Sequence, residues 1–196
     1  MQPIKCFLLK PTDTEARYLR RYRSSGDHSP DAKCSGPMGY HCARVRIEDG
    51  PADGERPAPP HDDPRWPKQC GCGYVFRDED QWQVFPLTVY VDDAGKPFTI
   101  HTNGDLALPA APAGAMWFAD WMPHTKGPDG RCLVVRCPAR PDGSGVADWM
   151  VDGPSTNGPG WTRTGEPPNV AANPSIFISA PDGFHGWLRD GVLTSC

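Results

Sequence analysis

The sequence has no long apolar run and no recognisable leader. No stretch of its 196 residues approaches the roughly 18 consecutive apolar residues of a membrane span. The N-terminal apolar run is too short for a signal peptide and is followed by no small-residue cleavage site. We therefore expect a protein that stays in a reducing cytoplasm, where its eight cysteines favour metal ligation or free thiols over disulfides.

Motifs of the common enzyme classes are also missing. The sequence has no paired-histidine metalloprotease motif, no Gly-x-Ser-x-Gly elbow and no phosphate-cradling glycine loop before a helix. His101, His124 and His185 lie among turn-forming residues without a nucleophile or an orienting third group. We expect these histidines not to converge on a metal or a cleft, so the sequence favours a non-enzymatic protein.

Proline and glycine are abundant, with 24 and 21 copies respectively. Proline removes a backbone donor and glycine raises the entropy cost of ordering, so both oppose long helices. Seven Trp, seven Phe and five Tyr supply core material that disordered chains lack. The composition predicts a mainly β, loop-rich fold of short strands and hairpins with few short helices, stabilised by zinc as argued below.

Alternating apolar and polar residues, bounded by turn residues, mark the expected strands. Helical turns are expected at residues 12–23, behind an Asp13 or Thr14 cap, and at residues 78–82. The connections between strands are short and rich in Asp-Gly, as hairpins require. The expected strands are residues 6–9, 43–47, 84–91, 97–101, 132–137, 148–151, 175–179 and 186–194.

A proline-rich, polar connector at residues 49–64 has little to bury. It separates a basic N-terminal segment, residues 1–48, from a β-rich body, residues 65–196. Residues 1–46 carry nine Lys and Arg against four Asp and Glu, whereas the rest carries eleven against twenty. This asymmetry indicates an acidic or nucleic-acid partner, or two halves that attract each other. The arginines expected to contact a partner are Arg17, Arg20, Arg21 and Arg23.

The most informative segment is a Cys-Gly-Cys-Gly knuckle. Cys70 and Cys72 can bend onto one metal because the glycines permit the positive φ that a knuckle needs. A structural zinc site needs four ligands, and we expect Cys34 and His41 from the preceding loop to complete it. Cys42 competes with His41, although its place at the start of a strand should turn its side chain away. The alternative is a set of free, partly buried thiols.

An aromatic run at residues 116–122 is open to two interpretations. It lacks the interleaved Lys and Arg of a nucleic-acid stacking face, so we expect it to pack in the core. Asp120, Asp148 and Asp152 lie beside tryptophans, where an acid–base pair is conceivable. We expect these three aspartates to cap turns instead.

Several motifs spread over nearly the whole chain resemble a family of uncharacterised phage and prophage proteins. At Cys42 and Cys137 the chain departs from that family's pattern, which favours His41 over Cys42 as a ligand. The stretch from Asn173 to the end is also similar to a wider domain of unknown function. The motifs that carry the resemblance are Arg20-Arg21-Tyr22, residues 36–41, Asp62 to Pro67 running into Cys-x-Cys-Gly-Tyr, Trp117-Phe118-Ala119-Asp120-Trp121, Gly165 to Val170 and His185 to Gly191.

The resemblance implies a phage origin, but it implies no activity, because the family is uncharacterised. We expect a non-enzymatic phage accessory protein, a minor capsid or decoration protein that binds other virion proteins. It would occupy the host cytoplasm during assembly and then the virion, with no membrane partner. Proline- and glycine-rich arms order well when laid on a partner, and aromatics with a charge dipole suit docking. The alternatives are an early-expressed phage protein that binds a host factor or nucleic acid, and a zinc-dependent enzyme.

Overall fold

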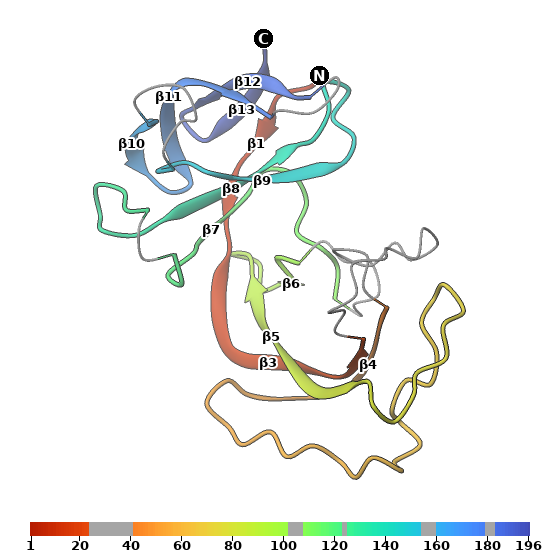
Figure 1. Ribbon diagram of the computed structural model, residues 1–196. Helices are drawn as coiled ribbons and strands as arrows, with labels where there is room; N and C mark the ends of the chain where they lie inside the picture. Colours follow the sequence, from red (N-terminus) through yellow and green to blue (C-terminus); the bar gives the residue numbers. More distant parts are fainter. Residues whose placement is uncertain (24–40, 102–107, 123–124, 154–159, 179–182) are drawn as a thin grey trace. The chain divides into compact units, whose positions relative to one another are not determined.

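The computed structural model describes residues 1–23, 41–101, 108–122, 125–153, 160–178 and 183–196. Across these ranges the chain is all-β, with three sheets and no helix (Figure 1). This confirms the expected mainly β class. Within the same ranges there is accordingly no helix long and apolar enough to cross a membrane.

The chain folds as two compact units. Unit 1 comprises Met1–Lys10, Asp92–Lys96 and Ala111–Cys196, and unit 2 comprises Pro11–Val91 and Pro97–Ala110. This division differs from the three consecutive segments expected from the sequence. Strand pairing between residues distant in the chain decides it, and composition does not reveal such pairing.

Unit 1 contains two sheets whose inward side chains share one core. Met116 and Val135 from one sheet lie in the same buried cluster as Ile176 and Leu188 from the other. The first sheet is antiparallel and has the order β1 (Ile4–Lys5), β13 (Val192–Ser195), β12 (His185–Arg189), β11 (Asn169–Phe177) and β10 (Thr162–Glu166). The second has the order β2 (Phe7–Leu8), β7 (Ala115–Phe118), β8 (Leu133–Pro138) and β9 (Val146–Met150), with β2 parallel to β7.

Unit 2 is built on one four-stranded sheet. Its core contains Ala16 and Tyr18 from the long strand β3, packed with Leu87 and Val89 from β5. A bulge between Ala16 and Tyr18 interrupts the pairing of β3 with β4. The sheet has the order β4 (Cys42–Pro51), β3 (Lys10–Tyr22), β5 (Gln81–Val91) and β6 (Pro97–Phe98).

The helix expected at residues 12–23 is wrong, because this stretch forms β3. The caps considered at Asp13 and Thr14 are a local preference, whereas eight registered pairs with β4 satisfy the strand's backbone groups. The helical turn expected at residues 78–82 is also wrong, because Gln81 and Trp82 already begin β5. The other expected strands are present with shifted ends, except that residues 186–194 form the two strands β12 and β13 in place of one. Strands β1, β7 and β10 are additional.

The proline-rich connector is attached to unit 2 by its own side chains. Arg56 donates two hydrogen bonds to the carboxylate of Glu15, at 2.6 and 2.7 Å. The His61 ring stacks on Trp82 with 4.4 Å between ring centroids. Ionic and aromatic contacts therefore hold a segment that has few apolar side chains to bury.

Candidate metal centre

One histidine and two cysteines of unit 2 form a cluster that can hold a metal ion. The ligand atoms of His41, Cys70 and Cys72 all lie within 4.8 Å of one another. Nδ1 of His41 lies 3.1 Å from Sγ of Cys72. His41 and Cys70 are buried, with 8% and 7% of their surface exposed, whereas Cys72 is half-buried.

The two cysteines sit in a tight turn that the local sequence specifies. An isolated antiparallel bridge joins Gln69 to Val75 and closes the base of the turn. Inside it, the amide of Gly73 donates to the carbonyl of Cys70 at 2.9 Å, and the amide of Cys70 donates to Tyr74 at 2.8 Å. Gly73 has a φ of +97°, which a residue with a Cβ rarely adopts. The turn therefore has the glycine-dependent geometry that the Cys-Gly-Cys-Gly motif predicts.

His41 reaches the knuckle from the start of β4 and is held from both sides. Its backbone carbonyl accepts a hydrogen bond from the amide of Arg23 at 3.0 Å. Its ring stacks on Tyr74, with centroids 4.1 Å apart and planes 9° apart. The Tyr74 hydroxyl in turn donates to Asp80 at 3.2 Å, and Asp80 also accepts the amide of Arg77 at 2.8 Å. These contacts fix the direction in which the imidazole points.

Three of the four predicted ligands are thus brought together, and Cys34 lies outside the described residues. Cys42, the competitor of His41, is not a member of the cluster that the described residues form. It contributes its backbone carbonyl instead, which accepts from Sγ of Cys70 at 3.4 Å. Two thiols and one imidazole are donors that bind transition metals once the thiols lose their protons. The cluster is therefore chemically able to hold a metal ion.

Two of the four arginines expected to bind a partner are buried in unit 2. Arg17 is 8% exposed and donates from Nη2 to the carbonyl of Pro51 at 3.0 Å. Arg21 is 5% exposed and donates from Nη2 to the carbonyl of Arg77 at 2.5 Å. Its guanidinium carbon also lies 3.6 Å from the ring centroid of Trp82. Both side chains are occupied by contacts within their own unit.

The other two arginines, Arg20 and Arg23, are more accessible. Arg20 is half-buried, with its guanidinium carbon 4.2 Å from the Tyr22 ring centroid and 5.1 Å from that of Phe85. Arg23 is exposed, and its guanidinium lies 5.7 Å from the Tyr74 ring. We expected the four arginines to form one cluster, but alternation along β3 places the neighbours Arg20 and Arg21 on opposite faces of the sheet, and Arg23 lies beyond the end of the strand.

The three aspartates expected to cap turns pair with arginines of unit 1 instead. Each partner is distant in the chain, so turn preferences alone could not indicate these pairs. Asp152 also accepts the amide of Leu133 at 3.0 Å, which ties it to the start of β8. The pairs are Asp120 with Arg131 at 2.7 Å, Asp148 with Arg136 at 2.6 Å and Asp152 with Arg163 at 2.9 Å.

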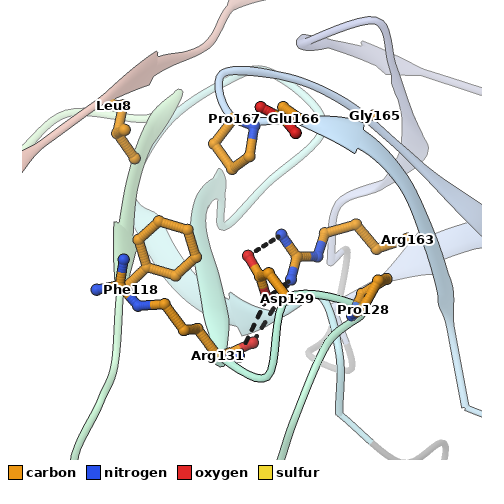
Figure 2. Close-up of a pocket in the computed structure, with 9 residues that line it drawn as sticks. All are labelled: Leu8, Phe118, Pro128, Asp129, Arg131, Arg163, Gly165, Glu166 and Pro167. Carbon is orange, nitrogen blue, oxygen red and sulfur yellow. Dashed lines mark hydrogen bonds and ion pairs between the residues drawn. The ribbon is translucent and has the colours of Figure 1, made fainter.

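A cavity of about 590 Å³ in unit 1 is lined by Phe118, Arg131, Glu166 and the Asp129–Arg163 pair (Figure 2). The Arg163 side chain is 2% exposed and donates to Asp129 at 2.6 Å and to Asp152 at 2.9 Å. Partial burial favours a raised pKa for Asp129, but the hydrogen bonds from Arg163 outweigh it and hold that pKa below its usual range. Asp129 therefore stays ionised at neutral pH and is poorly suited to act as a general acid.

The remaining sequence candidates have ordinary packing contacts. The His101 ring meets Phe85 edge-on at 6.4 Å, Nε2 of His185 lies 3.1 Å from the Ser175 hydroxyl, and His124 lies outside the described residues. In the aromatic run, Trp117 is 2% exposed, which agrees with the expected core role. Trp121, in contrast, is 59% exposed.

Comparisons of this chain with protein-family models, with curated proteins and with solved structures each find no match. The resemblance to phage proteins therefore stays a prediction. The functional argument depends on the chain's own residues.

Proposed function

We propose that this chain is a non-enzymatic phage accessory protein, a minor capsid or decoration protein, in which a structural zinc ion stabilises unit 2. The observation that carries the metal part is the cluster of His41, Cys70 and Cys72. The phage part comes from the sequence motifs alone. The metal would be held by these three residues together with Cys34.

The donor set favours zinc among the common metals. Thiolate and imidazole ligands suit zinc, whereas magnesium and calcium prefer oxygen. Zinc ligands at about 2.0–2.3 Å in a tetrahedron lie roughly 3.5 Å from one another. The atoms of His41, Cys70 and Cys72 are within 4.8 Å of one another, so small side-chain movements would bring all three onto one ion.

The surroundings of the cluster support a structural role. The cluster lies where three segments meet: the end of β3, the start of β4 and the knuckle before β5. His41 links them, because its backbone contacts Arg23 and its ring stacks on Tyr74. A metal there would cross-link segments distant in the chain, and such cross-links stabilise a fold with few helices and many loops. The chain around His41 also supplies the outer contacts that orient ligands in structural sites.

The fourth ligand separates this proposal from its enzymatic alternative. Structural zinc sites are closed by four protein ligands, whereas catalytic sites keep one position for water or substrate. Cys34 precedes His41 closely in the sequence and would close the site. If water took that position instead, the zinc-dependent enzyme would become the better hypothesis.

Metal analysis combined with cobalt substitution tests the metal part. We expect about one zinc per chain in the purified protein, as a single four-ligand site requires. Replacing zinc with Co²⁺ should give thiolate-to-cobalt absorption that falls by about one third in Cys34→Ser, because one of three thiolates is lost. Cys196→Ser, which removes an exposed thiol, is the matched control and should leave the spectrum unchanged. Equal spectra for wild type and Cys34→Ser would refute the closed site.

Two exposed aromatic side chains in unit 1 are consistent with docking onto other proteins. Trp121 is 59% exposed and Phe177 is 60% exposed, and aromatic residues are enriched in protein interfaces. Mass spectrometry of purified virions tests the virion role, and the chain should be present in them at a fixed ratio to the major capsid protein. Its presence only in infected-cell extracts would favour the early-expressed alternative.

A further inference from the structure

Two arginines face each other across the pairing of β3 with β4. Arg20 on β3 and Arg44 on β4 are registered partners, so their side chains leave the same face of the sheet as nearest cross-strand neighbours. Both are half-buried. Like charges directly opposite each other destabilise a sheet, so this pair calls for a compensating interaction.

An aromatic ring close to both guanidinium groups provides part of that compensation. The guanidinium carbons of Arg20 and Arg44 each lie 5.1 Å from the ring centroid of Phe85, and Arg20 also lies 4.2 Å from that of Tyr22. These cation–π contacts hold the planes of both guanidiniums in place. They neutralise no charge.

Neither arginine has a carboxylate partner among the residues that the structure describes. The Nε atoms of Arg20 and Arg44 are buried and make no hydrogen bond there. The nearby Arg46, also on β4, is by contrast paired bidentately with Asp49 at 2.7 and 2.8 Å. The Arg20–Arg44 pair is thus a fixed concentration of positive charge, and donors remain free on it.

We propose that the Arg20–Arg44 pair binds a partner protein through adjacent Asp or Glu side chains. This inference rests on the docking role proposed above and names the chemistry of the partner. Guanidinium groups present a planar fork that matches a carboxylate with two parallel hydrogen bonds. Two forks held side by side would engage two neighbouring carboxylates, which would also remove the repulsion between the arginines.

The charge around the pair favours a protein over a nucleic acid. Unit 2 contains eleven Lys and Arg against fourteen Asp and Glu, a formal net charge of −3. A long polyanion would therefore meet repulsion beyond the pair, whereas a short acidic segment would not. Both guanidinium groups already lie 5.1 Å from the Phe85 ring centroid, so a nucleic-acid base that stacked on this ring would compete with them.

The binding test uses the full-length, metal-loaded chain and a fluorescein-labelled hexaglutamate peptide in an anisotropy titration at low salt. Arg20→Gln and Arg44→Gln should each weaken binding about tenfold, since a charge-assisted bidentate contact is lost. Arg46→Gln is the matched control. It removes a positive charge two residues from Arg44, but that charge is already paired with Asp49, so the variant should bind the peptide as tightly as wild type. Arg44→Lys keeps the positive charge but not the planar fork of donors, so its affinity for the peptide should lie between those of wild type and Arg44→Gln.

Each outcome bears on the inference separately from the proposed function. Absence of peptide binding at millimolar concentration, or an equal loss in Arg46→Gln, would overturn it. Tighter binding of a labelled (dT)12 oligonucleotide that is lost in the same two variants would replace the protein partner with a nucleic acid. Circular dichroism of every variant checks that the fold is kept. If the peptide data hold and the chain is absent from virions, the proposed virion role fails alone.

Discussion

Removing one thiolate of the metal centre should destabilise unit 2 strongly. Cys72→Ser is the suitable change, because Cys72 is half-buried and its thiol lies 3.1 Å from Nδ1 of His41. Serine keeps the size of the side chain but supplies no thiolate. Any loss of stability would therefore come from the metal and not from a packing defect.

The size of the effect follows from mass action. A metal that binds only the folded state at a free concentration 1,000 times its Kd stabilises that state by about 4 kcal/mol. For a chain of 196 residues, each kcal/mol corresponds to roughly 2–4 °C in Tm. The Tm of the chain should therefore fall by about 8–16 °C in Cys72→Ser.

Thermal circular dichroism and limited proteolysis measure the change. Wild type treated with a strong chelator should melt like Cys72→Ser. Both should be cleaved early within residues 49–64, which run from the end of β4 toward the knuckle. Cys42→Ser is the matched control, because it changes a neighbouring cysteine that gives the cluster only its carbonyl. A metal-free wild type with an unchanged Tm would show that the cluster is a set of free thiols.

Three further predictions concern unit 1. Arg163→Met should cost about 3–5 kcal/mol in chemical denaturation, because it leaves the buried carboxylate of Asp152 uncompensated. The control Arg65→Met breaks a surface pair with Asp63 in unit 2 and should leave the denaturation midpoint nearly unchanged. Burial raises the pKa of the Cys6 thiol to about 12. Iodoacetamide labelling of the folded protein at pH 8 should therefore modify the exposed Cys196 and spare Cys6. Rapid labelling of Cys6 would contradict its burial. The pKa of Asp129 is lowered in the folded state, so the ionised carboxylate stabilises the fold above the ordinary aspartate pKa, and this stability is lost as pH falls through the lowered pKa. Asp129→Asn should therefore flatten the decline of Tm below pH 4. Parallel pH profiles of Tm for the variant and wild type would refute this.

Local sequence determined the class of fold and the Cys-Gly-Cys-Gly knuckle. Proline and glycine oppose helices wherever they occur, so the all-β outcome did not depend on any single long-range contact. The knuckle closes through hydrogen bonds between residues 69 and 75 and needs a positive φ at Gly73, all within one short stretch. A strand such as β8 follows from its own short apolar run, which is buried along its whole length.

The partner of each charged or ligating side chain was decided by the tertiary structure. Residues 12–23 became a strand because β4 satisfies their backbone groups, a condition that a local helix cap cannot reveal. His41 meets Cys72 across 31 positions of sequence, and Asp152 meets Arg163 across 11. The burial of Arg17 and Arg21, in contrast to the accessibility of Arg20 and Arg23, likewise depends on what packs against each side chain in the folded unit. A sequence states which donors and charges a chain possesses, but their energies depend on distance and burial, and only the folded chain sets those.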